Sequence, residues 1–75
     1  MSRLPMLQAK DIIRALKRFG FMEDRQKGSH LVMRNPLTGA RTVIPMHPGR
    51  TVKRGLLFGI LKDAQVSVEE FIKVL

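Results

Sequence analysis

A histidine follows a glycine turn inside the most basic stretch of this 75-residue chain. The turn reads Gly28-Ser29-His30, and residues 25–62 around it hold eight Lys or Arg and no Asp or Glu. Histidine ordinarily has a pKa near neutrality, so a neutral imidazole can accept a proton at physiological pH. The surrounding positive charge can hold phosphate. These residues are suited to cleaving RNA without a metal ion, with His30 as general base for attack by the ribose 2′-hydroxyl.

A complete cleavage reaction needs more than one base. Lys27 and Arg25 are the cations nearest to His30 in sequence, and they can stabilise charge on the phosphate oxygens. The leaving 5′-oxygen needs an acid, which the sequence does not identify. His47 is the only other histidine, and it serves only if the fold brings it close to His30; otherwise it is a loop histidine.

Other basic residues are candidates for gripping the RNA backbone, although each could equally be solvated. Ser29 could orient a phosphate or His30, but a hydroxyl beside a turn more often bonds the backbone. Without Trp or Tyr, base stacking falls to Phe58 or to a guanidinium. The predicted RNA-binding residues are Arg25, Lys27, Ser29, Arg34, Arg41, Arg50, Lys53 and Arg54.

Metal-dependent chemistry is disfavoured by the residue types present. The sequence holds six acidic residues without a cluster suited to Mg²⁺, and two histidines without cysteine make a poor zinc site. Serine-protease chemistry is disfavoured too, because neither Glu23 nor Asp24 is spaced to orient a histidine. We therefore expect no metal and no other cofactor.

The net charge of +8 predicts a polyanionic partner, which is nucleic acid, an acidic protein or an anionic membrane surface. The alternative is a basic surface that is merely solvated. No signal peptide or stretch long enough to span a membrane is visible, and cysteine is absent. We expect a cytoplasmic protein.

Apolar residues at helical spacing predict helices over residues 9–19 and 53–64. Gly20 suits a left-handed end to the first helix, and Thr51 is the expected N-cap of the second. A capping box at residues 67–70 begins a last short helix that runs to residue 75.

Three short strands are expected between the two main helices. Residues 21–26 and 29–34 flank Lys27-Gly28, which suits a tight hairpin with Gly28 at positive φ. The third strand, residues 41–46, contains Pro45 and should lie at an edge. The order α-β-β-β-α predicts one α+β domain over residues 1–75, a two-layer sandwich in which both helices cover one face of a three-stranded antiparallel sheet.

With this order in place, the chain resembles the HicA-type (YcfA-like) toxins of bacterial toxin–antitoxin systems over nearly its whole length. These toxins are messenger-RNA interferases with a fold like that of double-stranded-RNA-binding domains. The landmarks that carry the resemblance are Gly20-Phe21, Arg25-Gln26-Lys27-Gly28-Ser29-His30, Arg34-Asn35-Pro36, Val43-Ile44-Pro45-Met46-His47, Gly55, Ile60-Leu61-Lys62 and Ser67-Val68-Glu69-Glu70-Phe71.

The resemblance implies that His30 is catalytic, that RNA cleavage arrests translation, and that a HicB-type antitoxin covers the toxin. Gln8 and Gln65 depart from the pattern, standing where a hydroxyl cap and a glycine are common. Leu56 and Phe58 stand where polar or basic residues are commoner. Phe58 turns away from the buried face of its helix, which makes it a candidate contact for a partner.

Three rival functions remain open at this point. The first is an RNA-binding module of the same fold in which His30 takes no part in chemistry. The second is an adaptor for an acidic protein. The third is a membrane-surface protein, disfavoured because the apolar face of the first helix is needed to cover the sheet.

Overall fold

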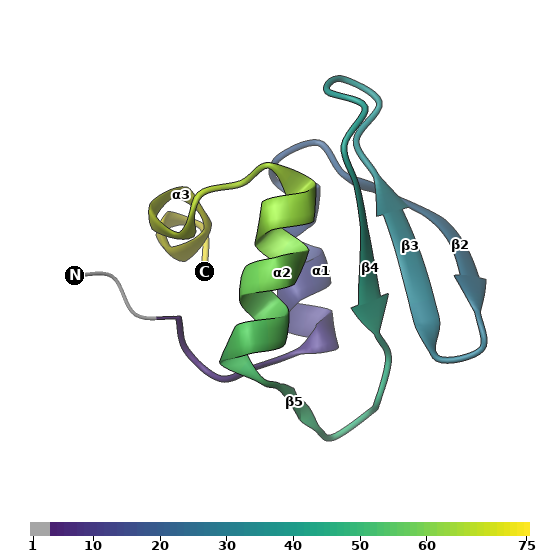
Figure 1. Ribbon diagram of the computed structural model, residues 1–75, viewed down its shortest axis with the longest axis vertical. Helices are drawn as coiled ribbons and strands as arrows, with labels where there is room; N and C mark the ends of the chain where they lie inside the picture. Colours follow the sequence, from purple (N-terminus) through teal and green to yellow (C-terminus); the bar gives the residue numbers. More distant parts are fainter. Residues whose placement is uncertain (1–3) are drawn as a thin grey trace.

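The computed structural model describes residues 4–75 as two short strands, two main helices, a three-stranded sheet and a short final helix (Figure 1). The elements are β1 (Leu7–Gln8), α1 (Ala9–Lys17), β2 (Met22–Lys27), β3 (His30–Arg34), β4 (Arg41–Pro45), β5 (Thr51–Val52), α2 (Arg54–Ala64) and α3 (Val68–Lys73).

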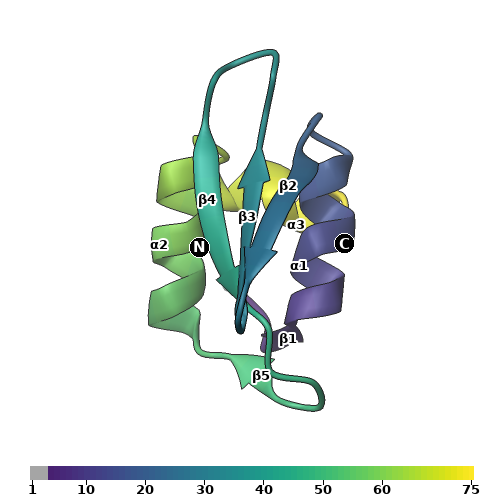
Figure 2. The ribbon, with the colours of Figure 1, turned by 90° about the vertical axis from the view of Figure 1, so that its right-hand side faces the viewer.

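The sheet is antiparallel with β3 in the middle, and α1 and α2 both lie against one of its faces (Figure 2). α3 lies at the far side of this helical layer, away from the sheet (Figure 1). The predicted α+β sandwich and its α-β-β-β-α order are therefore confirmed. Among residues 4–75, no element covers the other face of the sheet (Figure 2).

The strand sequences explain which face is covered. In β3, Leu31 and Met33 are buried while their neighbours are not, and Ile44 is buried in β4. Alternate residues of a strand point to opposite faces, so these side chains form the half of the core that the helices cover. The helices complete the core with the following buried side chains: Ile12 and Leu16 from α1, and Leu57, Ile60 and Leu61 from α2.

A second, two-stranded sheet was not predicted. β1 pairs antiparallel with β5, with Leu7 opposite Val52 and Gln8 opposite Thr51. Thr51 is therefore a strand residue and not the N-cap of α2, and that prediction is wrong. Lys53 occupies the N-cap position instead. The sequence of residues 1–7 also suggests an extended lead-in; Leu7 does lie in β1, whereas residues 1–3 fall outside the described part of the chain.

Both main helices end with the same pair of backbone hydrogen bonds. After α1, Gly20 N–H donates to Lys17 O and Phe21 N–H donates to Leu16 O, at 3.1 and 3.2 Å. After α2, Gln65 and Val66 repeat the pattern, each at 3.1 Å. This double bond pattern is a Schellman motif, which needs a left-handed residue after the helix. Gly20 has φ +99°, whereas Gln65 is held at φ +61°.

Replacing Gln65 by glycine is therefore expected to stabilise the fold. A side chain in the left-handed region costs about 1 kcal/mol, and glycine removes most of this cost. Urea denaturation of Gln65→Gly should show a higher midpoint than the parent protein. The matched variant Gly20→Ala, which introduces a side chain at the other left-handed position, should lower it. A midpoint for Gln65→Gly at or below that of the parent would contradict the strain argument.

None of the helices that the structure describes in residues 4–75 has the length and apolar character to cross a membrane.

Candidate active site

His30 is the first residue of β3 and follows the turn that joins β2 to β3. The turn residues are Gly28 and Ser29, one position later than predicted, and Gly28 has φ +60° while Ser29 does not have positive φ. A positive φ at only the first turn residue is the pattern of a type II′ hairpin. Nothing crowds the position of a Gly28 Cβ. Glycine is therefore favoured there by backbone conformation, and this conformation fixes His30 in register.

His30 lies in a cross-strand row with Lys27 of β2 and Pro45 of β4. Directly opposed residues share a face and have Cβ atoms about 5 Å apart. Next to this row, the Met46 N–H donates a hydrogen bond to Ser29 O at 2.6 Å, which joins the β2–β3 turn to the end of β4. His30 is exposed on the uncovered face of the sheet. A substrate can therefore reach its imidazole from solvent.

Two further rows complete this uncovered face. Arg25 stands opposite Val32, which stands opposite Val43, and the last row is Met22, Arg34 and Arg41. We call these residues the open face, and it comprises Met22, Arg25, Lys27, His30, Val32, Arg34, Arg41, Val43 and Pro45. It joins four of the eight predicted RNA-binding residues to the predicted catalytic histidine.

The nearest acidic residues do not neutralise the open face. Glu23 is opposite the buried Met33, so it points to the helical side, where it pairs with Lys17 Nζ at 2.8 Å. Asp24 sits at the register shift in β2, and its carboxylate is 4.0 Å from Arg25 Nε. Such an exposed pair is weak, so the Arg25 guanidinium stays available to a ligand.

Apolar residues lie between the cations of the open face. Met22 is 56% exposed and Val43 is 43% exposed. Val32 separates the histidine row from the arginine row. The sequence analysis did not include these apolar residues in the predicted site. The alternation of Val32 and Val43 with buried neighbours is the signal that places them on the open face. The open face thus combines positive charge with exposed apolar side chains.

The remaining predicted residues lie elsewhere. Arg50 and Lys53 line a hollow of about 230 Å³ beyond the end of β4, together with His47. The Nε of Arg54 donates to Leu4 O at 2.6 Å, so this side chain holds the N-terminal segment against α2. Ser29 is half-buried in the hairpin turn. Phe58 is 50% exposed on α2.

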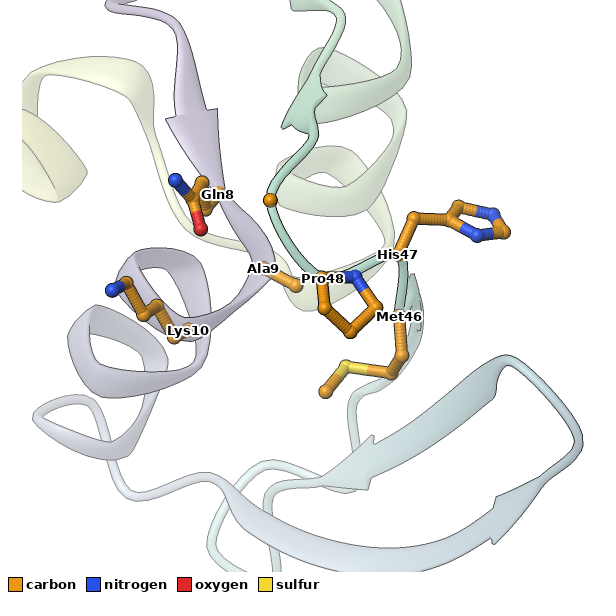
Figure 3. A pocket seen from close by; sticks show the side chains of 7 residues that line it. Gln8, Ala9, Lys10, Met46, His47 and Pro48 are labelled. Carbon is orange, nitrogen blue, oxygen red and sulfur yellow. The ribbon is translucent and has the colours of Figure 1, made fainter.

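A second hollow, of about 320 Å³, lies between the start of α1 and the loop after β4 (Figure 3). Met46 and Pro48 point toward Ala9 across it, whereas the ring of His47 points away from Gln8 and Lys10 (Figure 3). His47 borders both hollows. Among residues 4–75 no three His, Asp or Glu side chains are grouped so that they could hold a metal ion.

The arrangement of hairpin, sheet and helices matches a known family model. Residues 9–66 match the model described as the HicA toxin of bacterial toxin–antitoxin systems. The matched segment is well over half of the chain. This chain belongs to the HicA toxin family. The resemblance predicted from the sequence landmarks is thereby confirmed. Comparison with curated proteins gave no match.

Membership of the HicA family assigns the chain to the toxins of toxin–antitoxin systems, in which each toxin has an antitoxin as its partner. The HicA match extends from the start of α1 to the second residue after the end of α2, so it includes the hairpin, His30 and the whole open face. α3 lies beyond the matched segment. Its buried Phe71 nevertheless belongs to the same core as the HicA segment.

Proposed function

We propose that this toxin is a metal-independent endoribonuclease that cleaves messenger RNA, with His30 as general base. The observation that carries the proposal is the row formed by Lys27, His30 and Pro45 on a face with four cations. An accessible imidazole beside a fixed positive charge is what attack by a ribose hydroxyl on its own phosphate requires. Because messenger RNA is translated in the cytoplasm, the proposal implies a cytoplasmic protein.

In the proposed reaction, neutral His30 accepts the proton of a ribose 2′-hydroxyl. The 2′-oxygen then bonds to the adjacent phosphorus, and the bond from phosphorus to the 5′-oxygen of the next nucleotide breaks. The departing oxygen takes a proton from water, and His30 returns its proton to solvent. Lys27 stabilises the charge that develops on the non-bridging oxygens. The products are a 2′,3′-cyclic phosphate and a 5′-hydroxyl.

The test of this function is incubation of the purified protein with labelled single-stranded RNA in EDTA. Cleavage that leaves 2′,3′-cyclic phosphate ends would support the proposal, because chelation removes the metal ions that a contaminating metal-dependent nuclease needs. RNA that binds but stays intact would instead favour the RNA-binding module. RNA that neither binds nor breaks would exclude both functions.

Salt dependence checks the contribution of the open face. Its cations Arg25, Lys27, Arg34 and Arg41 can contact about four phosphates of a single strand, which predicts a slope of about −3 for log affinity against log salt. The measurement is fluorescence anisotropy with RNA that carries 2′-O-methyl groups and therefore cannot be cleaved by this mechanism. Arg34→Ala should make the slope shallower by just under one unit. An unchanged slope would remove Arg34 from the interface.

We further propose that the partner is a HicB-like antitoxin protein that contacts Phe58. This side chain is half-exposed on α2, while Leu57 and Leu61 of the same helix are buried. A large aromatic group left on a helix surface is suited to anchoring a protein partner. The basic surface of the toxin favours an acidic antitoxin.

A further inference from the structure

The hollow beyond the end of β4 has no role in the reaction described so far. It measures about 230 Å³ and is built from the last residue of β4, the following loop, β5 and the start of α2. Figure 2 shows β5 beyond the same end of the sheet at which the β2–β3 turn lies. The lining residues are Pro45, His47, Arg50, Thr51, Val52, Lys53 and Leu56.

The charge of this hollow suits a phosphate. Arg50 and Lys53 are both exposed, and the lining contains no acidic residue. The hollow also adjoins the N-terminal end of α2, where Lys53 occupies the N-cap and has no side-chain acceptor with which to cap the helix. The positive end of the helix dipole adds to the two side-chain charges. An anion bound here would meet positive potential from three sources.

The rest of the lining suits a nucleobase or ribose. Leu56 is 50% exposed, and the half-buried Pro45 and the buried Val52 also line the hollow. The imidazole of His47 offers a further ring against which a base can stack. Leu56 was set apart in the sequence because polar residues are commoner at its position. A contact with a base would explain why an apolar residue stands at this position.

The hollow is continuous with the proposed catalytic row and is held firmly in place. Pro45, which lines it, stands directly opposite His30 in the sheet. The Arg50 N–H donates to His47 O at 3.0 Å, and this hydrogen bond closes the loop that carries Arg50. The next element, β5, is paired to β1. RNA bound at His30 can therefore extend into a preformed hollow without rearrangement of the chain.

We propose that this hollow is a subsite for the nucleotide one step beyond the two that flank the cleaved bond, with Arg50 and Lys53 on its phosphate and Leu56 against its base. The proposal rests on the proposed function, since it assigns a further nucleotide of the same substrate. The hollow at the start of α1 is a weaker candidate for this role. Its lining holds one Lys, Lys10, and no Arg, so less positive charge surrounds a phosphate there than between Arg50 and Lys53.

A titration with cytidine 5′-monophosphate tests the subsite without any need for cleavage. Amide resonances of Thr51, Val52 and Leu56 in a ¹⁵N-labelled protein should shift with a common saturation curve. Inorganic phosphate should move the resonances of Arg50 and Lys53 more than that of Leu56. Leu56→Ser should weaken nucleotide binding and leave phosphate binding unchanged. Resonances in the hollow that stay still at saturating nucleotide would overturn the proposal.

Cleavage of short RNAs tests the role of the subsite in the reaction. A dinucleotide carries only the scissile phosphate, whereas a trinucleotide adds one nucleotide on the 5′ or the 3′ side. The parent protein should cleave one of the two trinucleotides with a higher kcat/KM than the dinucleotide. Arg50→Ala and Leu56→Ser should each reduce this gain about tenfold, as expected for loss of one phosphate or base contact, and spare the dinucleotide.

Two matched variants control for charge and for exposed apolar surface. Lys73→Ala removes one positive charge on α3, and Leu37→Ser removes an exposed leucine from the β3–β4 turn at the opposite end of the sheet (Figure 2). Both should keep the full gain. A gain that survives in Arg50→Ala and Leu56→Ser would overturn the subsite alone. If the parent protein cleaves no RNA, the proposed function fails, and the nucleotide titration still decides whether the hollow binds a nucleotide.

Discussion

Replacing His30 by alanine should lower the rate of RNA cleavage about 10²- to 10⁴-fold, the range that a positioned general base contributes. The imidazole is exposed and lies between Lys27 and Pro45, so its loss disturbs no core contact. Binding of 2′-O-methyl RNA should stay within a few-fold of the parent value, because the four cations of the open face remain. The measurements are single-turnover cleavage and fluorescence anisotropy.

Added imidazole sharpens this test. A free base that diffuses to the vacated position should restore part of the cleavage by His30→Ala and have little effect on the parent protein. His30→Gln, which keeps a polar side chain but cannot act as the base, should be as slow as His30→Ala. Cleavage at the parental rate by either variant would remove His30 from the mechanism.

Replacing Asn35 by alanine is expected to cost about 2–3 kcal/mol of unfolding free energy, since two hydrogen bonds are lost and their partners stay behind. Asn35 Nδ2 donates to Phe19 O, and Asn35 Oδ1 accepts from Leu37 N–H, both at 2.9 Å. Asn35 is only 4% exposed, so water replaces these bonds poorly. A domain of this size should show a midpoint of thermal unfolding at least about 10 °C lower.

Thr38→Ala is the matched control for this loss. Thr38 Oγ1 accepts from Ala40 N–H at 3.2 Å in the same β3–β4 turn, but its side chain is exposed. Its removal should cost less than about 1 kcal/mol. Equal losses in the two variants would show that the turn as a whole, and not the bond from Asn35 to the end of α1, sets the stability. The landmark Arg34-Asn35-Pro36 thus has a structural explanation.

Local patterns in the sequence were sufficient to predict the main layers. The 3.6-residue spacing of Ile12, Ile13 and Leu16 predicted a helix with one buried face, and the spacing of residues 21–26 and 29–34 around a glycine predicted the hairpin. α1 ends at Lys17, two residues earlier than predicted, because the Schellman bonds begin there. Gly20 was correctly predicted to take a left-handed conformation.

Register was harder to predict, and it decides the composition of the site. A turn at Lys27-Gly28 would have placed Arg25 opposite His30, whereas the observed turn at Gly28-Ser29 places Lys27 there. A shift of one residue changes every cross-strand neighbour, and local sequence separates the two turns poorly. The irregularity between Glu23 and Arg25, which returns Arg25 to the open face, also has no clear sequence signal.

Contacts between distant parts of the chain were missed altogether. β1 and β5 are more than 40 residues apart in sequence, and two-residue strands leave no periodicity to detect. The bond from Arg54 to Leu4 spans a similar separation, so Arg54 could not be told apart from the cations free to meet RNA. The pairing with β1 also holds β5, which lines the hollow that contains Arg50 and Lys53.

The position of His30 on the central strand has a consequence for how the toxin can be silenced. Its backbone is paired with β2 on one side and β4 on the other, so the imidazole cannot change position without disturbing the sheet. If His30 is the catalytic group, as proposed, an inhibitor gains little by deforming it and needs only to shield the sheet from solvent. Activity masked in this way would return as soon as the shield is degraded, with no delay for refolding.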